Sequence, residues 1–296
     1  MEERLPSYGG QAVIEGVLMR GTRFIAMAMR APDGNIVMHE EELKGIYTTS
    51  WMKIPFLRGL VGLWDALGVG MRFLTISANT QTGEDEKLEG WPLYLTLGGS
   101  LLLGIGIFFL APAGVGALAE SILGWGSLSS NVLEGLLRLA LLVLYIWAIG
   151  FMPDIRRVFQ YHGAEHKTIN AFEAQAELTP DVVSTYSLEH PRCGTSFLLT
   201  LVVFSIILFA ALGPLPTIWR LVSRVVLLPL LAGVAYEYIR WMAHHLNSKL
   251  VCWLIKPNLA LQKLTTREPD LKQVEVAITA FKAMFEKEEA AKSTSS

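Results

Sequence analysis

The stretch at residues 132–152, VLEGLLRLALLVLYIWAIGFM, decides the fold of this chain. It is mostly apolar, and it is long enough to cross a bilayer as a helix, which takes about 20 residues. The aromatic side chains of Trp147 and Phe151 near its end are typical of a membrane interface. A short polar run follows directly: Pro153, Asp154, Arg156 and Arg157. The stretch therefore predicts a helix that crosses a membrane and stops at its surface.

Three further apolar stretches have the length of a span, at about residues 92–111, 196–212 and 218–241. In the last of them, Pro229 and Gly233 predict a bend. The composition agrees with a bundle of such helices, because 52% of the residues are hydrophobic, 18% are charged and the mean hydropathy is +0.40. The sequence thus predicts a mainly α-helical integral membrane protein with about four transmembrane helices.

The basic residues predict how this bundle is oriented. The first ninety residues hold nine Lys and Arg residues, whereas the stretch 112–131 between the first two spans holds none. Because basic residues are retained on the cytoplasmic side, we expect both termini and the loop 153–195 there. Arg220 and Arg224 fall at the opposite end of the fourth span, and we expect them to snorkel or to pair with Glu120 or Glu134.

The polar ends of the chain predict smaller elements. Residues 23–30 and 36–42 alternate as strands do on either side of a turn at 32–35, which predicts a β-hairpin, with residues 9–16 as a further strand. From Pro269 onward, apolar residues recur on one helical face, which predicts a cytosolic amphipathic helix with a frayed tail at 286–296. The residues on that face are Leu271, Val274, Ile278, Phe281 and Phe285.

Two segments are of mixed character and are expected at the membrane interface. They are residues 57–78, for which a fifth span is the alternative, and residues 244–264. The domains then follow as residues 1–90, a hairpin and an interfacial helix, and residues 91–242, the bundle with its 153–195 loop. Residues 243–296 form the C-terminal part.

Two short motifs at the same predicted membrane edge carry candidate metal ligands. In HGAEH, His162 and His166 are one helical turn apart and project from the same face, with Glu165 beside them. The order H-x-x-E-H is the inverzincin arrangement. In HPRC, His190 and Cys193 add a third imidazole and a thiol, and these four groups suit tetrahedral zinc.

The two motifs allow a structural or a catalytic site. Four protein ligands would close a structural zinc site, whereas three ligands and water would leave it open, with Glu165 as the base. In the inverzincin arrangement a later acidic residue is the third ligand, and Glu173 and Glu237 are the candidates. Alternatively, the two HGAEH histidines bond only to backbone or to lipid head groups. Cys193 could also act as a reactive thiol beside Arg192, whereas Cys252 is expected to be an apolar filler.

The opening GGQAVIEGVLMRG, residues 9–21, allows two interpretations. Gln11, Glu15 or Arg20 could reach a bound substrate, or Glu15 could pair with Arg20 or Arg58 to hold the hairpin on the bundle. A separate possibility is that three arginines bind a lipid phosphate at the inner leaflet or merely anchor the chain there: Arg58, Arg192 and Arg240.

This opening segment resembles the signature of the bacterial YqhQ-like family of membrane proteins, a family of unknown function that is often labelled a predicted metal-dependent enzyme. Four later segments match as well, at residues 159–167, 190–197, 228–240 and 265–269. The resemblance spans nearly the whole chain. It implies the fold, a location in the bacterial inner membrane and a candidate site, but it implies no reaction.

Together these features predict a metal-dependent hydrolase that acts on a membrane-associated substrate through zinc and Glu165. The alternative is a non-catalytic scaffold or assembly factor in which the metal only staples the loop 153–195. A transporter is less favoured, because few ionisable groups are expected deep in the spans and the chain shows no paired halves. Membrane lipid and an unidentified substrate or protein are the expected partners, and the net charge of -2 gives no reason to expect nucleic acid.

Overall fold

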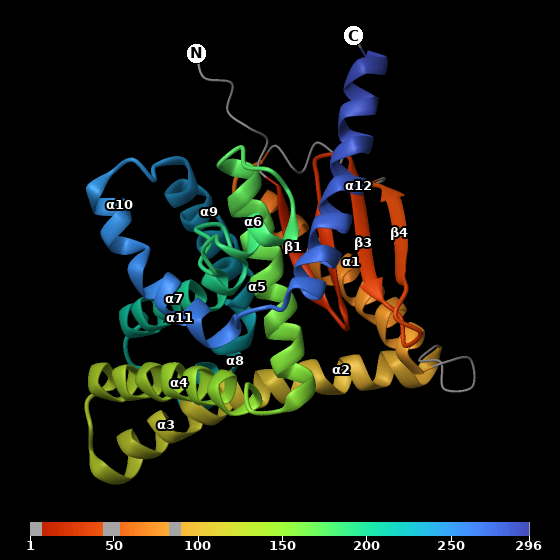
Figure 1. The fold of residues 1–296 in the computed structure, drawn as a ribbon. Helices are drawn as coiled ribbons and strands as arrows, with labels where there is room; N and C mark the ends of the chain where they lie inside the picture. The colour runs from red at the N-terminus through yellow and green to blue at the C-terminus, as the bar shows by residue number, and fades with distance from the viewer. Residues whose placement is uncertain (1–7, 44–53, 83–89, 296) are drawn as a thin grey trace.

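The computed structural model describes residues 8–43, 54–82 and 90–295, which form a mainly helical protein with one small sheet (Figure 1). Four of the basic residues counted for the orientation lie outside the described residues: Arg4, Lys44, Lys53 and Lys87. Within the described part, the elements fall into a sheet layer flanked by helices and a bundle of apolar helices. One helix, α5 (Pro153–Glu173), joins the two parts.

The sheet is an antiparallel meander in the order β1-β2-β3-β4. Its strands are β1 (Gly9–Val13), β2 (Gly16–Arg20), β3 (Phe24–Arg30) and β4 (Ile36–Glu42). The predicted hairpin is confirmed as β3 and β4, whereas the single further strand is replaced by the two strands β1 and β2. The turn at Ile14 and Glu15 separates them, with Glu15 at a positive φ of 52°.

Both faces of the sheet are covered, since alternate residues of each strand point to opposite sides. Val17 and Ala28 face α12 (Leu271–Ser295), where Val274, Ile278 and Phe281 are buried. The apolar face predicted for this helix is therefore present, although Leu271 at its start is exposed. The opposite face of the sheet packs on Phe73 of α1 (Leu57–Thr82).

The predicted fraying of residues 286–296 is wrong as far as Ser295, because α12 continues to that residue. Glu288 holds this part of the helix to the sheet. Its carboxylate accepts hydrogen bonds from the Thr22 hydroxyl and from the backbone N–H groups of Arg23 and Phe24, at 2.6 to 2.9 Å. A side chain at Gly21 would collide with this carboxylate, which explains the glycine there.

The bundle contains three described helices that are long and apolar enough to cross a membrane, or four if a bent pair counts as one span. They are α1, the continuous segment Trp91–Leu123, and α4 (Ser127–Ile149); the bent pair is α8 (Thr217–Val226) with α9 (Leu228–His244) at 45°. The expected bend near Pro229 is thus found. The apolar helix α7 (Thr195–Ala211) is shorter than these.

The loop expected at residues 112–131 is largely helical. The helix α2 (Trp91–Ile105) continues through a π turn, η4 (Gly106–Leu110), into α3 (Ala111–Leu123), and only residues 124–126 separate α3 from α4. Pro112 lies inside this continuous helix and has no N–H to donate to the carbonyl of Phe108, four residues earlier. The π turn precedes the proline, and the Phe108 carbonyl accepts a hydrogen bond from Nε of Arg138 at 3.0 Å instead. The segment 57–78, expected at the interface, lies in α1 between the sheet and α9.

The bundle buries a network of charged side chains. Glu134 and Arg138 of α4 are 0% and 1% exposed, and Arg224 of α8 donates to both carboxylate oxygens of Glu134 at 2.7 and 2.8 Å. Arg220 bonds to Glu120 of α3 at 2.8 Å. The pairing expected for the two α8 arginines is therefore confirmed. The expectation of few ionisable groups deep in the spans is wrong for this bundle.

The remaining helices are short, and they pack on α5 and α12 or on α4, α7 and each other. They are α6 (Pro180–Ser184), α10 (Lys249–Leu254) and α11 (Lys256–Thr265), the last two covering the segment 244–264 that was expected at the interface. Leu261 of α11 packs on Leu142 and Ile146 of α4 and on Leu199 of α7. As Figure 1 shows, α5 rises steeply from the end of α4 and passes beside β1.

Candidate metal centre

The site is built on α5, whose sequence favours a helix that begins where the bundle ends. Pro153 lies in the first turn, where proline is tolerated, and Asp154 lies beside the positive end of the helix dipole. The helix brings His162 and His166 onto one face, with ring centroids 4.4 Å apart. The helical spacing predicted for the two histidines is therefore found.

Backbone carbonyl groups fix the protonation of both rings. Nδ1 of His162 lies 2.9 Å from the carbonyl oxygen of Thr265, and Nδ1 of His166 lies 2.5 Å from that of Leu188. A carbonyl oxygen only accepts, so in each neutral ring Nδ1 carries the proton and Nε2 keeps a lone pair. Proteins orient histidine ligands toward a metal in this way.

Cys193 lies opposite the two rings. Its Sγ is 3.2 Å from Nε2 of His162, and one ligand atom from each of His162, His166 and Cys193 lies within 4.8 Å of the others. Thr195, at the start of α7, holds the sulfur through its hydroxyl at 3.1 Å and its backbone N–H at 3.4 Å. The two motifs, which lie 31 residues apart at His162 and Cys193, therefore meet as predicted.

One atom of this group is conspicuously unsatisfied. Nε2 of His166 is buried and makes no hydrogen bond of good geometry among the described residues, although the nearby Cys193 thiol raises the pKa of the ring and partly offsets the effect of burial. Burial lowers the pKa of His166, which keeps the ring neutral and its Nε2 lone pair available. Because buried polar atoms are nearly always paired, an unpaired nitrogen beside a thiol fits a site that takes an electrophile such as a metal ion. The N, N, S donor set is one that zinc accepts.

His190 lies next to this group without joining it. Its ring centroid is 5.8 Å from that of His166, and its buried Nε2 lies 3.6 Å from a carboxylate oxygen of Glu173. Gln262 of α11 fixes the backbone here, because its side chain bonds to both the N–H and the carbonyl of His190. Of the four predicted ligands, three converge and His190 stands behind them.

Glu165 lies at the edge of the same group. It is 4% exposed, and its Oε2 lies 3.8 Å from Nε2 of His162 and 3.9 Å from Nε2 of His166. Burial raises the pKa of this carboxyl, and the nearby His162, His190 and backbone of Gly10 only partly offset that effect. The strand β1 packs directly on it: a Cβ at Gly10 would lie 2.7 Å from Cγ of Glu165.

The other predicted carboxylates are engaged elsewhere. Glu237 forms an ion pair with Arg58 at 2.5 Å, so it does not supply the third ligand expected of an inverzincin, and Glu173 pairs with Arg192. Arg58 and Arg192, two of the three arginines considered for binding a lipid phosphate, are therefore already in ion pairs.

The partner expected for Glu15 is also different. Its carboxylate lies 2.5 Å from Arg157 of α5, and it pairs with neither Arg20 nor Arg58. Glu15 therefore joins the sheet to a helix, as the structural interpretation expected. The arginine that it pairs with is Arg157 and not Arg20 or Arg58. Arg157 follows the bundle directly, which places this pair where the sheet meets the apolar helices.

Residues far apart in the sequence support the site. Arg267 donates its backbone N–H to the carbonyl of Phe159 at 2.9 Å, and a Cβ at Gly163 would lie 2.3 Å from the carbonyl oxygen of Arg267. Gly163 thus lets the segment that carries Thr265 lie against α5. The Thr265 and Leu188 contacts could not be predicted from residue types, because every residue has a backbone carbonyl.

The chain is similar to known sequences of undetermined function. The family described as "Protein of unknown function (DUF1385)" matches residues 54–287. The chain is also 35% identical over 301 residues to the "Uncharacterized protein YqhQ" of Bacillus subtilis (strain 168), a match that covers 95% of this chain and 92% of that protein. No solved structure matches the chain.

Proposed function

This chain belongs to the DUF1385 family, and we propose that it is a metal-dependent hydrolase of the bacterial inner membrane that acts on a membrane-associated substrate. We propose that zinc is held by His162, His166 and Cys193 at the cytoplasmic edge of the bundle. The observation that carries this proposal is the convergence of two imidazoles, each with Nδ1 bonded to a carbonyl, on one buried thiol.

The three converging groups favour a catalytic zinc site with an open position over a structural zinc site. Three protein ligands are typical of catalytic zinc, whereas structural zinc has four. Bound zinc would supply a Lewis acid and would lower the pKa of water to about 7. Glu165 is the residue to accept the proton at Oε2, since this atom lies beside both imidazoles. His190 lies buried behind the group, and burial lowers the pKa of its ring, so this residue stays neutral.

Metal analysis tests the proposal directly. Full-length protein purified without chelator should hold about one zinc per chain by mass spectrometry of the metal, and His166→Ala and Cys193→Ser should lose it. His244→Ala and Cys252→Ser are matched controls, because both side chains are exposed and lie outside the group, and they should keep the metal. A metal-free wild-type protein would contradict the proposal.

Glu165→Gln separates the hydrolase from a scaffold. The variant should keep zinc and fold, but it should fail to restore the phenotype of a strain that lacks the protein. The amide cannot accept the proton, although it fills the same space. If Glu165→Gln complements fully while His166→Ala does not, the metal is structural and the scaffold is supported.

The contact between Cys193 and His162 also favours a second candidate, a thiol nucleophile. Sγ lies 3.2 Å from Nε2 of His162, and Nδ1 of that ring is bonded to the Thr265 carbonyl. In this arrangement Cys193 is the nucleophile, His162 is the base and the carbonyl orients the base. Alkylation with iodoacetamide distinguishes the two. Zinc should protect Cys193 but not the exposed Cys252, whereas a catalytic thiol would be modified fastest of all and would show no protection.

A further inference from the structure

The strand β1 forms one edge of the sheet, and part of its backbone points away from β2. Within the described residues the strand order is β1-β2-β3-β4, so β1 has a neighbouring strand on one side only. The backbone N–H of Arg30 donates to the carbonyl of Glu15. In an antiparallel sheet this bond directs the backbone groups of Gly16 toward β1, so those of every second residue of β1 face β2. Gly10 and Ala12 are the residues whose backbone groups face away.

One of these outward groups is already bonded to the candidate site. The backbone N–H of Gly10 donates a hydrogen bond to the carboxylate of Glu165. The carbonyl of Gly10 and both backbone groups of Ala12 have no hydrogen-bond partner among the described residues. Gly9, Gly10 and Gln11 are exposed, so the edge is accessible there. Open backbone groups at the edge of a sheet are a template on which an extended chain can add as a further strand.

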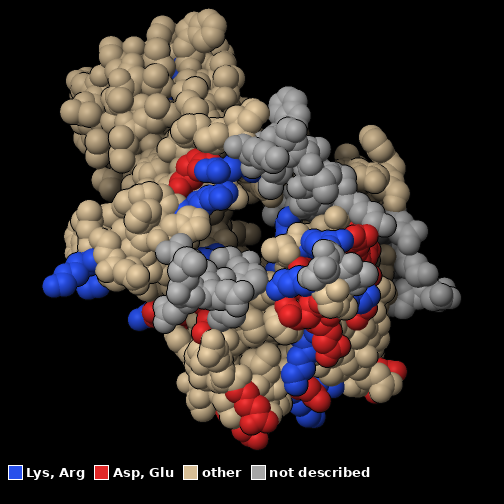
Figure 2. All heavy atoms as spheres, turned by 90° about the horizontal axis from the view of Figure 1, so that it is seen from above, with Lys and Arg blue, Asp and Glu red and all other residues tan. Residues whose placement is uncertain are grey.

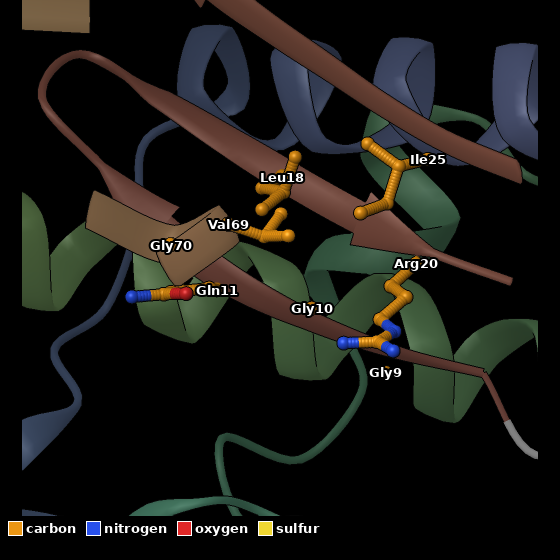
Figure 3. Close-up of a pocket in the computed structure, with 8 residues that line it drawn as sticks. All are labelled: Gly9, Gly10, Gln11, Leu18, Arg20, Ile25, Val69 and Gly70. Carbon is orange, nitrogen blue, oxygen red and sulfur yellow. The ribbon is translucent and has the colours of Figure 1, made fainter. Parts of the chain in front are cut away.

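A pocket of about 170 Å³ lies beside the same edge, on the side of α1 (Figure 3). Its walls are mostly apolar, with Leu18 and Ile25 from the sheet and Val69 and Gly70 from α1. Gly9 leaves it open, because a Cβ there would meet nothing within 4 Å of the described residues. Sites for whole small molecules are larger, roughly 300 to 1,000 Å³, so this pocket fits a single apolar side chain.

The pocket and the open backbone groups are placed for one and the same residue of an added strand. Side chains alternate along β1, so Gly9 and Gln11 face the pocket, whereas Ala12 packs on the opposite face of the sheet. A residue opposite Gln11 in a parallel strand would donate its N–H to the Gly10 carbonyl and accept from the Ala12 N–H. Its side chain would point to the same side as Gln11, toward the pocket. The Gly10 N–H keeps its bond to Glu165 in this arrangement.

The charges around the sheet favour neither an anion nor a cation. Seen from above, acidic and basic side chains are mixed over the charged part of the surface (Figure 2). On the sheet they form ion pairs, as Glu42 does with Arg23 and Glu41 with Arg72. A neutral backbone with an apolar side chain therefore fits this edge better than a charged head group, since the backbone supplies the affinity and the pocket the specificity.

We propose that β1 binds an extended segment of a membrane-associated protein as an additional strand, with one apolar side chain in the pocket of Leu18, Ile25 and Val69. Resting on the proposed hydrolase, this binding makes peptides the substrate class. A Cβ at Gly10 would lie 2.7 Å from Cγ of Glu165, so the bound segment runs past the proposed base. Hydrolysis needs only water as co-reactant: its hydroxyl adds to the carbonyl carbon, and the proton that Glu165 accepts passes to the leaving nitrogen as the C–N bond breaks.

Binding of labelled peptides to the full chain in detergent tests this edge. The protein carries Glu165→Gln, which leaves the peptide uncut, while the amide oxygen still accepts from Gly10. The probe is the peptide TTTLTTT with blocked ends, and two matched peptides carry aspartate or N-methyl leucine at the centre. In fluorescence anisotropy the aspartate peptide should bind about 10- to 100-fold more weakly, because no leucine side chain is buried. The N-methyl peptide should bind about three- to tenfold more weakly, because one hydrogen bond is lost.

Two changes in β1 separate the pocket from the backbone. Gly9→Leu enters the open side of the pocket, where a Cβ meets no described residue. Ala12→Pro removes the outward N–H, and proline is tolerated at the edge of a sheet. Both should weaken binding of the leucine probe, whereas Ala12→Ser keeps the N–H and should bind it unchanged. Hydrogen exchange at the Ala12 amide gives a direct readout, because an added strand should slow it.

The outcomes separate this edge from the hydrolase. Equal binding of the leucine and aspartate probes overturns the role of the pocket, and unchanged exchange at Ala12 with the probe bound overturns the added strand. Diacylglycerol that binds with the same loss in Gly9→Leu overturns the assignment to a peptide. Zinc content is measured on the same samples: a zinc-free protein that binds the probe through β1 defeats the hydrolase alone, and a zinc-loaded protein that binds no probe defeats the peptide assignment alone.

Discussion

Two buried polar clusters of this protein differ in one respect, the completeness of their hydrogen bonding. In the bundle, Arg138 donates to Glu134, to the Ser205 hydroxyl and to the Phe108 carbonyl, and Arg224 bonds to Glu134 and Asn131. No buried side-chain nitrogen or oxygen of that network lacks a hydrogen-bond partner among the described residues, whereas Nε2 of His166 and Nε2 of His190 both lack one at the candidate metal centre.

The difference separates a clamp from a binding site. Buried charges cost several kcal/mol each unless paired, so a fully paired network holds α3, α4, α7 and α8 in one arrangement and has little to offer a ligand. An unpaired lone pair beside a thiol carries the same kind of cost until something binds there. The first cluster is therefore expected to matter for folding and the second for function.

The largest effect is expected in the fully paired charge network of the bundle. Glu134→Ala leaves Arg138 and Arg224 without their shared carboxylate inside the bundle, and breaking a buried pair in this way costs about 3–5 kcal/mol. The variant should show a strongly lowered unfolding temperature in detergent, by far-UV circular dichroism. Glu120→Ala is the control with a smaller effect, because the Glu120 side chain is 30% exposed. Equal losses in both variants would contradict the role given to Glu134.

The second-largest effect is expected at the candidate metal centre, from a change in the backbone that orients His162. Gly163→Ala forces a methyl group against the Arg267 carbonyl, which pushes the segment with Thr265 away from His162. Loss of such an orienting partner typically reduces metal affinity about 10- to 100-fold. Zinc titration against a competing chelator measures this change.

Gly194→Ala is the matched control for that experiment. It lies beside Cys193, but a Cβ there meets nothing within 4 Å of the described residues, so its zinc affinity should equal that of wild type. An unchanged affinity in Gly163→Ala would show that the Thr265 carbonyl does not orient His162.

These two clusters also show what the sequence could reveal. The i, i+4 spacing of His162 and His166 is a local pattern, so it predicted the core of the site. The same spacing relates Glu134 to Arg138, yet the apolar residues around them hid the pair within a span. The partners on α8, 90 residues away, come from tertiary structure alone. The continuous helix through Pro112 was not predicted because a proline inside a helix usually ends it. The π turn before Pro112 and the bond from Arg138 to the Phe108 carbonyl depend on tertiary structure.

A third, smaller effect concerns a buried carboxylate outside both clusters. Burial alone would raise the pKa of Glu288, but the hydrogen bonds from Thr22, Arg23 and Phe24 outweigh it and hold the pKa below its usual value. A lowered folded-state pKa means that the stabilisation is present above the usual pKa and is lost as the pH falls through the lowered one. The docking of α12 on the sheet should therefore weaken as the pH falls below the usual carboxyl pKa toward the lowered one.

Hydrogen exchange of the α12 amides between pH 7 and acid pH measures this loss, after correction for the intrinsic rates. Glu288→Gln should weaken the docking by about 1–3 kcal/mol at neutral pH, as expected for hydrogen bonds to a charged group, and should remove its pH dependence. Glu289→Gln, beside it on α12, pairs with Lys292 on the exposed surface and should behave as wild type. A pH dependence that survives in Glu288→Gln would assign it to another group.

The smallest effect is expected at the half-exposed ion pair of Glu15 and Arg157, which belongs to neither of the two buried clusters. Glu15 pairs with Arg157, whose side chain is 50% exposed, and exposed pairs contribute about 0–1 kcal/mol. Glu15 also has a φ of 52°, a conformation that asparagine adopts more readily. Glu15→Asn should thus lose the pair, regain part of that energy from the backbone, and change the stability by less than about 1 kcal/mol. Zinc content should be unchanged. A loss of zinc or of complementation would move Glu15 from a tie between sheet and helix into the site, as the functional interpretation of the opening segment holds.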